Sequence, residues 1–112
     1  MEVTKRTRDG ITILGPKGKI TIGKGDIALR DSIQQALAGG AKKILIDLGS
    51  TKKMDSSGMG ELVAARARVI EHGAELKLMN LPKKIKNVLG IAQLITAYDI
   101  FDEEEEAVGS FS

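Results

Sequence analysis

Short apolar runs along this chain alternate with longer segments in which apolar residues recur at helical spacing. Residues 3–8 and 11–14 have the pattern of short strands, and the Asp-Gly pair at 9–10 between them is typical of a hairpin turn. The Gly-Pro-Lys-Gly segment at 15–18 is expected to interrupt the second strand, which residues 19–22 then resume. The chain is therefore predicted to begin with a β-hairpin whose second strand is broken.

A first helix is predicted from three apolar residues at helical spacing, Leu29, Ile33 and Leu37. Asp26 stands ahead of them as the expected N-cap, because its side chain can accept an unpaired N–H of the first turn. The glycine pair at 39–40 supplies the stop.

A central strand and a second helix follow. Residues 44–48 form a short apolar run, typical of a strand covered on both faces, and Asp47 within it is expected to bond to backbone. After the segment 55–60 we expect a helix of about four turns that ends at residues 72–73. Its apolar residues are predicted to form one buried face: Met59, Leu62, Val63, Val69 and Ile70.

The remaining elements are shorter. Leu76 and Leu78 alternate with polar neighbours as in a strand, and Pro82 suits the first position of a third helix, where a missing N–H costs nothing. The buried residues of that helix are expected to be Ile85, Val88 and Leu89. A last strand at 97–101 leads to an acidic run at 102–106 that opens a terminal helix, with Asp102 as its cap. The order β-β-α-β-α-β-α-β-α predicts one α/β domain over residues 1–112, a mixed sheet with packing helices.

Composition excludes several classes of function. The 112 residues contain no cysteine and one histidine, so disulfides, thiolate metal sites and His-dependent catalysis have little to work with, and we expect neither metal nor cofactor. No apolar run approaches the roughly 18 residues of a membrane span, and residues 1–6 lack the apolar core of a signal peptide, so no membrane contact and a cytoplasmic location are expected. A net charge of +2 and three aromatic residues argue against direct nucleic-acid binding, and the basic clusters are interpreted as solvated surface.

Two glycine-rich segments match nucleotide motifs only in part. In residues 18–25 the spacing approaches that of a phosphate-binding loop, but Gly25 stands where Ser or Thr must bind magnesium. Gly58 and Gly60 do not make a dinucleotide fingerprint, because Val63 occupies the third glycine position. Neither segment predicts a nucleotide site.

The segment 55–60, Asp-Ser-Ser-Gly-Met-Gly, is the strongest functional candidate. It places two hydroxyls at a helix start, where backbone N–H groups are unpaired. Capping explains the Asp and Ser residues but not the glycines, each of which costs about 1 kcal/mol in a helix relative to alanine. Close approach of another backbone, from the domain or from a partner, would compensate for them. A serine nucleophile is not favoured, because His72 is predicted about 20 Å away at the far end of the helix. An interaction or modification site and simple capping remain equal alternatives.

The pattern around this segment resembles the STAS-domain family of anti-sigma-factor antagonists. The resemblance extends from residue 3 to residue 111, and its most specific part is residues 54–62. Further segments that carry it are 18–20, 43–48, 73–80 and 98–102.

This resemblance implies that the chain is the substrate of a protein kinase and not an enzyme. Ser56 would be phosphorylated by an anti-sigma factor that is also a serine kinase, and a phosphatase would reset the switch. The unphosphorylated chain would bind that kinase and free a sigma factor. Asp55 would position the serine loop, and the partner-binding surface would include Ser57, Gly58, Met59, Thr21 and Asp26.

The chain also departs from the family pattern. Thr21 stands where many members carry Asp, an extra glycine-rich turn follows it, and Thr51 and Lys53 replace residues that are usually apolar. Two alternatives therefore remain: a constitutive scaffold subunit of a signalling or lipid-transport complex, and a small-molecule or nucleotide-binding module that uses the loop 15–25.

Overall fold

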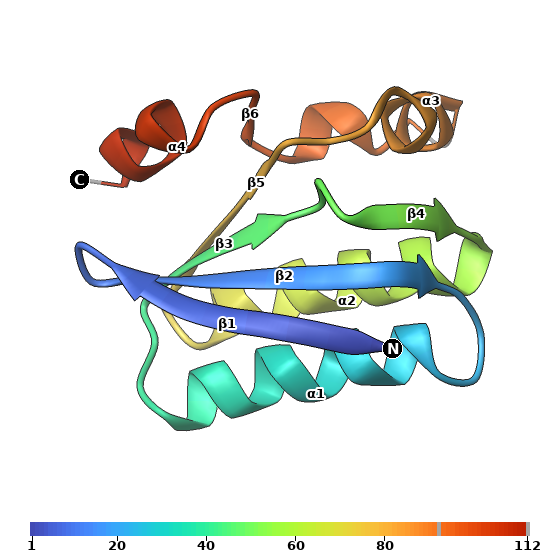
Figure 1. The fold of residues 1–112 in the computed structure, drawn as a ribbon. Coiled ribbons are helices and arrows are strands. Elements are labelled where there is room, and N and C mark those ends of the chain that lie inside the picture. Colours follow the sequence, from blue (N-terminus) through green and yellow to red (C-terminus); the bar gives the residue numbers. More distant parts are fainter. Residues whose placement is uncertain (92, 112) are drawn as a thin grey trace.

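The structure is a computed structural model that describes residues 1–91 and 93–111; Ala92 and Ser112, which belong to the predicted domain 1–112, lie outside the described residues. It is an α/β fold in which a mixed sheet is covered by helices, as predicted (Figure 1). Its strands are β1 Glu2–Arg8, β2 Ile11–Ile20, β3 Lys43–Asp47, β4 Thr51–Met54, β5 Glu75–Met79 and β6 Ile100–Phe101. Its helices are α1 Gly25–Ala38, α2 Ser56–Glu71, α3 Lys83–Ile91 and α4 Glu104–Ser110, with a 3-10 turn η1 at Ile95–Ala97.

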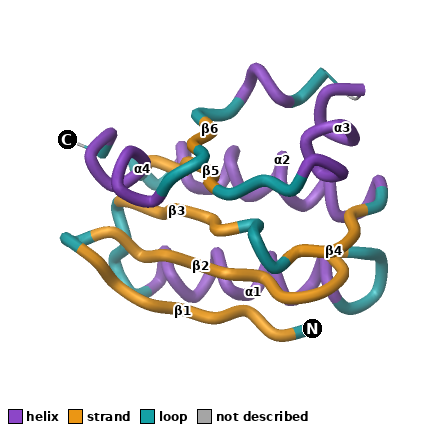
Figure 2. Tube along the Cα trace, turned by 45° about the horizontal axis from the view of Figure 1, so that its top comes forward, coloured by secondary structure: helices purple, strands orange, loops and turns teal. Residues whose placement is uncertain are grey.

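The sheet is organised around β2. The strand order is β1-β2-β3-β5-β6, with β4 paired to β2 outside this path (Figure 2). Only β1 is antiparallel to its neighbour; every other pairing is parallel. Helices α1 and α2 lie side by side under one face, and α3 and α4 lie on the opposite side of the sheet (Figure 1). The carboxyl ends of β2 and β4 and the first residues of α1 and α2 therefore meet at one end of the molecule.

Strand β2 is continuous through residues 15–18, so the predicted interruption is wrong. Its parallel pairing passes from β3, which it leaves at Leu14, to β4, which it joins at Gly18. Pro16 lies between these two pairings, where its missing N–H breaks no bond to either strand. The strand also ends at Ile20 and does not continue to residue 22, because a turn begins there.

Strand β4 is absent from the predicted order. It has only four residues, and two exposed lysines, Lys52 and Lys53, stand between the buried side chains of Thr51 and Met54. This pattern does not alternate, so it carries no strand signal. The last strand is likewise shorter than predicted, because residues 95–97 form the 3-10 turn and only Ile100–Phe101 pair with β5.

Alternating residues of the buried strands supply two hydrophobic clusters, one on each face. Ile44 and Ile46 of β3 join the cluster formed with α1 and α2, and Leu45 joins the cluster under α4. The α2 residues that enter the first cluster are Leu62, Ala65 and Val69. Contrary to prediction, Val63 and Ile70 are 43% and 54% exposed. They are each one residue beyond a buried position, which rotates them by about 100° out of the core.

Two predicted caps are also corrected. Helix α1 is preceded by Lys24, and Asp26 lies within its first turn. Helix α4 is preceded by Glu103, which makes no side-chain cap bond, and Asp102 instead accepts from Lys86 at 3.2 Å. Asp47 does bond to backbone, as predicted, by accepting the N–H of Gly49 at 2.9 Å.

Candidate functional site

The segment predicted as the site forms the first turn of α2, directly after β4. Asp55 is the N-cap residue in extended conformation, and one carboxylate oxygen accepts the N–H of Gly58 at 2.9 Å. Capping by Asp55 satisfies one of the unpaired N–H groups that every helix start exposes. The capping interpretation of Asp55 is therefore confirmed, and neither serine is needed as a cap.

The second oxygen of Asp55 holds a different part of the chain. It accepts the N–H of Ile22 at 3.0 Å, in the turn that joins β2 to α1. The N–H groups of Gly58 and Ile22, in that order of effect, lower the pKa of Asp55. An ionised carboxylate thus ties the helix start to the neighbouring turn.

The two serines differ in exposure. Ser56 is exposed as the first residue of α2, whereas Ser57 is half-buried. In the part of the chain that the structure describes, neither side-chain hydroxyl has a hydrogen-bond partner, and both stand beside a carboxylate that is fully occupied by backbone. Ser56 is therefore the hydroxyl that another protein can reach.

The two glycines of the segment differ in their surroundings. A Cβ on Gly58 would lie 2.1 Å from the carbonyl oxygen of Ile20 and 2.9 Å from Cγ of Met54, so only glycine lets α2 begin this close to the end of β2. This confirms the predicted close approach and assigns it to the domain itself. A Cβ on Gly60 would meet no heavy atom within 4 Å, and Gly60 is exposed. Gly60 has no packing role among the described residues and leaves the surface of the helix start bare.

The turn after β2 completes the arrangement. The carbonyl of Thr21 accepts the N–H of Asp26 at 3.1 Å, and Oδ1 of Asp26 accepts the N–H of Gly23 at 3.0 Å and of Ile27 at 2.8 Å. These N–H groups are the donors that a nucleotide phosphate would require. Because a carbonyl and a carboxylate of the chain already accept them, the turn is built as a closed loop and not as an open phosphate cradle.

The structure brings the predicted residues of this turn, Thr21 and Asp26, next to the predicted residues of α2 through the bond between Ile22 and Asp55. Sequence reasoning missed Ile22, whose side chain is 73% exposed. An apolar residue in a glycine-rich turn is the only signal that could have identified it.

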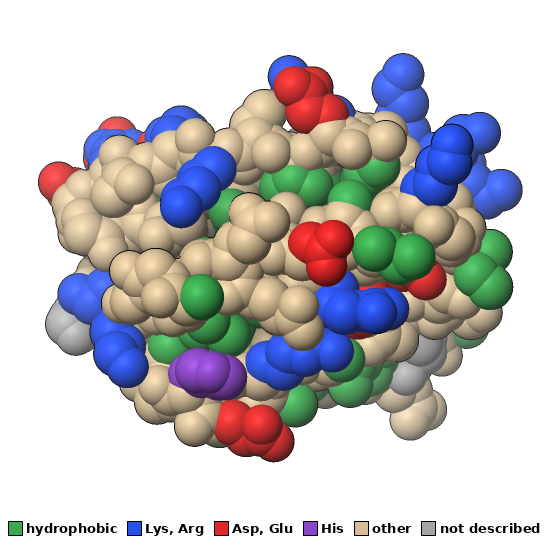
Figure 3. Space-filling model, turned by 90° about the horizontal axis from the view of Figure 1, so that it is seen from below, with side chains coloured by type: hydrophobic (Ala, Val, Ile, Leu, Met, Phe, Trp, Pro, Cys, Tyr) green, Lys and Arg blue, Asp and Glu red, His purple; other side chains and the backbone are tan. Residues whose placement is uncertain are grey.

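Exposed and half-buried apolar residues lie on the same end of the molecule as the serine. Ser56, Gly60 and Val63 follow one another at the i, i+4, i+7 spacing of a single helix face, beside the half-buried Met59. With Ile22 from the neighbouring turn, the exposed or half-buried residues Ile22, Met59 and Val63 form what we call the apolar patch. Figure 3 shows the face of α1 and α2 with apolar side chains at the surface toward the end where both helices begin.

No metal or nucleophile arrangement adjoins this segment. Among residues 1–91 and 93–111, no group of three or more His, Cys, Asp or Glu side chains could hold a metal ion. His72 follows the last residue of α2, and its ring Nδ1 lies 2.8 Å from the carbonyl of Arg68. The whole length of the helix separates it from Ser56.

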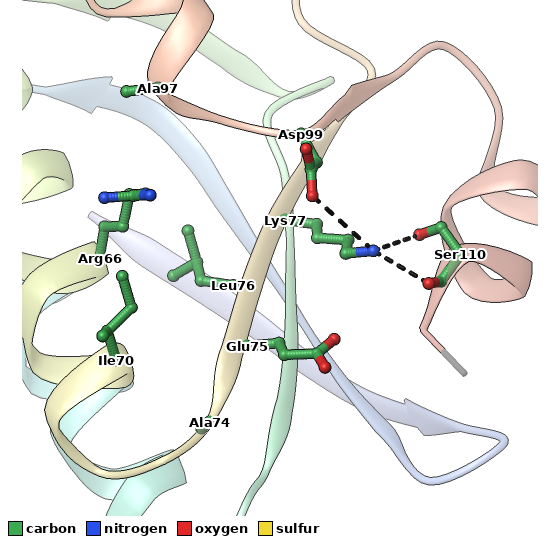
Figure 4. Close-up of a pocket in the computed structure, with 9 residues that line it drawn as sticks. All are labelled: Arg66, Ile70, Ala74, Glu75, Leu76, Lys77, Ala97, Asp99 and Ser110. Atoms are coloured by element: carbon green, nitrogen blue, oxygen red, sulfur yellow. Dashed lines mark hydrogen bonds and ion pairs between the residues drawn. The ribbon is translucent and has the colours of Figure 1, made fainter.

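The largest cavity described, about 390 Å³, lies away from these residues, between the later turns of α2, the first half of β5 and the C-terminal segment (Figure 4). Its charged lining residues are Arg66, Glu75, Lys77 and Asp99. The ammonium of Lys77 donates to the carbonyl and the hydroxyl of Ser110 at 3.0 Å and lies 3.8 Å from Asp99. The Lys77 ammonium therefore already has partners within the chain, and none of the predicted site residues lines this cavity.

No helix in the described part of the chain is both long enough and apolar enough to cross a bilayer.

Comparison with known proteins gives one family and a consistent fold. The profile of the STAS domain matches residues 2–107. A candidate anti-sigma factor antagonist from Thermotoga maritima superposes with a TM-score of 0.87 and 22% identity, covering 96% of this chain and 92% of that one. The Bacillus cell fate determinant SpoIIAA in its phosphorylated form gives 0.74 and 18%, covering 99% and 100%.

A sulfate transporter family protein from Wolinella succinogenes fits as well as SpoIIAA does, with a TM-score of 0.74 and 17% identity over 95% of this chain and 88% of that one. At these identities the structural likeness establishes the fold alone. The same fold thus occurs in proteins with different assignments, and the residues of this chain must decide between them.

Proposed function

Because this chain belongs to the STAS domain family, we propose that it is an anti-sigma-factor antagonist whose binding to its partner is switched by phosphorylation of Ser56. The unphosphorylated chain binds an anti-sigma factor that is also a serine kinase, and this releases a sigma factor. A phosphatase removes the phosphate and restores binding. The proposal rests on one observation above the others: an exposed hydroxyl at the first position of a helix, next to a carboxylate that is wholly engaged with backbone.

The local geometry supports Ser56 as the acceptor. Its neighbour Ser57 is half-buried, so a kinase would have to displace packed atoms to reach it. Asp55 keeps the helix start and the β2–α1 turn in fixed relation, which presents Ser56 in one defined place. A phosphorylated form is also described for SpoIIAA, which shares this fold.

The proposed switch has a simple electrostatic cause. A phosphate adds about −1.5 to −2 charges and considerable bulk at the middle of a contact surface. The adjacent Asp55 is already negative and cannot compensate, although the helix start partly offsets the added charge. The loss of a few kcal/mol of binding free energy corresponds to two or three powers of ten in affinity.

The direct test is phosphate transfer. The chain is incubated with ATP and each anti-sigma factor serine kinase of its source organism, and the site is read by mass spectrometry. We expect one phosphate on wild type and on Ser57→Ala, and none on Ser56→Ala. Equal uptake by the two variants would show that Ser56 is not the acceptor.

A second candidate is a constitutive scaffold role, in which Ser56 is never modified. It is favoured by the sulfate transporter family protein, whose structure fits this chain as well as that of SpoIIAA. Phosphopeptide analysis of the protein purified from its own cells separates the two candidates. A peptide spanning residues 54–66 that stays unmodified under all growth conditions supports the scaffold.

A further inference from the structure

Six exposed lysines gather at the end of the molecule that carries Ser56. They come from four separate segments, namely the end of β2, the turn before α1, strand β4 and the first turn of α3. We call them the lysine rim: Lys19, Lys24, Lys52, Lys53, Lys83 and Lys84. Figure 3, which views the molecule from the side of α1 and α2, shows one group of Lys and Arg side chains (blue) at this end and others elsewhere on the same face.

Each neighbouring pair of segments is linked by an observed contact. Lys19 and Lys24 line one surface hollow of about 320 Å³ between the end of β2 and the start of α1. Lys19 and Lys53 are Cα partners in the parallel pairing of β2 with β4, so both side chains stand on the same face. Strand β4 packs in turn against α3, which begins with Lys83 and Lys84. The segments that carry the rim are therefore contiguous in the fold although they are far apart in sequence.

The rim has no internal counter-charge. Within the described residues, none of its six lysines lies within 4 Å of a carboxylate. Of the carboxylates at this end, Asp26 and Asp55 are engaged by backbone N–H groups, and Glu2 lies 3.9 Å from Lys17. The acidic run that opens α4 lies at the opposite end, where Glu104 pairs with Arg6 and Arg8 (Figure 1).

This arrangement does not serve stability. Like charges directly opposite one another in a sheet are destabilising, and Lys19 stands opposite Lys53. Long solvated side chains also keep their conformational entropy when they have no partner, so the rim gains nothing within the chain itself. A local feature that works against folding is expected where another molecule compensates for it.

We infer that the lysine rim, together with the apolar patch at the same end of the molecule, docks a partner protein that presents Asp and Glu side chains beside an apolar surface. This inference rests on the proposed function and specifies the chemistry of the partner. Ser56 follows β4, three residues after Lys53, so its phosphate would reduce the positive potential that attracts the acidic partner. The switch therefore acts through charge neutralisation of the rim as well as through bulk.

A protein fits this surface better than a nucleic acid. The apolar patch is aliphatic, with Ile22 and Val63 exposed, and it contains none of the aromatic side chains on which bases stack. Tyr98, Phe101 and Phe111 all lie in the C-terminal segment, and Tyr98 and Phe111 are buried. Exposed aliphatic side chains with charged side chains beside them are typical of a protein–protein interface.

The chain offers a matched pair of variants. Lys52→Glu with Lys53→Glu reverses two charges within the rim, and Lys42→Glu with Lys43→Glu reverses the same number at the start of β3, outside it. Both double variants are checked for folding by circular dichroism and urea titration. The probe is the kinase that phosphorylates wild type in the preceding test, and its dissociation constant is measured at about 50 mM and about 500 mM salt, where exposed charges are weakly and strongly screened.

We expect salt to weaken wild-type binding by about tenfold or more, since rim charges act through a screened potential. The rim variant should bind about tenfold more weakly at low salt and lose most of this salt dependence, whereas the control should stay within about threefold of wild type. Equal weakening of both variants, or salt-independent wild-type binding, would overturn the inference. Tighter binding to a single-stranded oligonucleotide or to phosphatidylserine vesicles, lost in the rim variant, would assign the rim to that ligand instead.

The two proposals fail in different ways. Absence of phosphate on wild-type Ser56 with every kinase tested removes the proposed function and with it this inference. Phosphate uptake by wild type with no difference between the two lysine pairs removes the inference alone.

Discussion

Asp55 accepts the backbone N–H of Ile22 at 3.0 Å, across 33 positions of sequence. This bond joins two surfaces that the proposed function requires together, the helix start with its serine and the turn after β2. The other oxygen of the same carboxylate caps α2 through Gly58 at 2.9 Å. One side chain therefore controls both the position of Ser56 and the conformation of the neighbouring turn.

Replacement of Asp55 should loosen the β2–α1 turn more than the fold. Asp55→Ala removes both acceptors, so the amide of Ile22 should exchange with solvent about tenfold faster or more. Asp47→Ala is the control, because Asp47 also accepts a loop N–H at a strand end but does not contact Ile22. Hydrogen exchange followed by NMR gives the comparison. Unchanged protection of Ile22 in Asp55→Ala would show that the bond does not hold the turn.

The two glycines of α2 should respond in opposite directions to alanine. Gly58→Ala places a Cβ 2.1 Å from the carbonyl oxygen of Ile20, a backbone atom that cannot swing away, so the free energy of unfolding should fall by about 3 kcal/mol. Gly60→Ala meets open space and should raise it by about 0.5–1 kcal/mol through helix propensity. Urea titration of both variants checks the pair. Similar effects at the two positions would contradict the packing at Gly58.

A negative charge at Ser56 should weaken partner binding without unfolding the domain. Ser56→Asp carries part of the charge of a phosphate, and we expect at least about tenfold weaker binding to the kinase, or about 1.4 kcal/mol. Ser50→Asp adds the same charge to an exposed serine at the opposite end of β4 and should change affinity much less. Calorimetry measures both. Identical affinity of Ser56→Asp and wild type would argue against a charge switch at this position.

The cluster of Glu104 with Arg6 and Arg8 predicts an acid-dependent loss of stability. The two guanidinium groups, Arg6 first, lower the pKa of Glu104 to about 2. Since this pKa is below the ordinary value, the contribution of the cluster is fully present above about pH 4.5 and is lost as the pH falls toward 2. Glu104→Gln should therefore flatten the fall of the unfolding free energy across that window.

The control for this prediction is Glu106→Gln, a neighbouring exposed carboxyl that makes no ion pair within the described residues. In this variant the free energy of unfolding should fall with pH below 4.5 as steeply as in wild type. If both variants lose stability with pH as wild type does, the acid sensitivity belongs to other carboxylates.

Local patterns in the sequence were sufficient to predict an element where one residue type decides its conformation. The apolar run at residues 44–48 identified the buried strand β3, and the spacing of Leu29 and Ile33 identified helix α1. Both predictions succeeded because burial imposes a pattern on apolar residues. The predicted break of β2 at Pro16 was wrong because the effect of a proline depends on whether a neighbouring strand pairs with it. That pairing is set by the distant strands β3 and β4.

The site was predictable in the same measure. The motif at residues 55–60 predicted the start of a helix, and Gly58 predicted the close approach of another backbone segment. Strand β4 was missed because its adjacent lysines look like a loop. The lysine rim could not be seen either, since its members become neighbours only after β2, β4 and α3 have come together. Lys83 and Lys84, which were interpreted as solvated charge, thus lie on a helix that packs against the strand of Lys52 and Lys53.

The ion pairs that join β1 to α4 divide the molecule into two regions with different freedom to evolve. Arg6 and Arg8, near the beginning of the chain, hold Glu104 and Glu105, near its end, so the end of the molecule opposite Ser56 is closed by its own charges. The surface around Ser56 is built from residues between 19 and 84 and takes no part in these ion pairs. Its lysines and exposed aliphatic residues can therefore be exchanged with little consequence for folding. Duplicated copies of such a chain can diverge toward different partners while they keep one scaffold, and cross-talk among them would be set by a few surface charges.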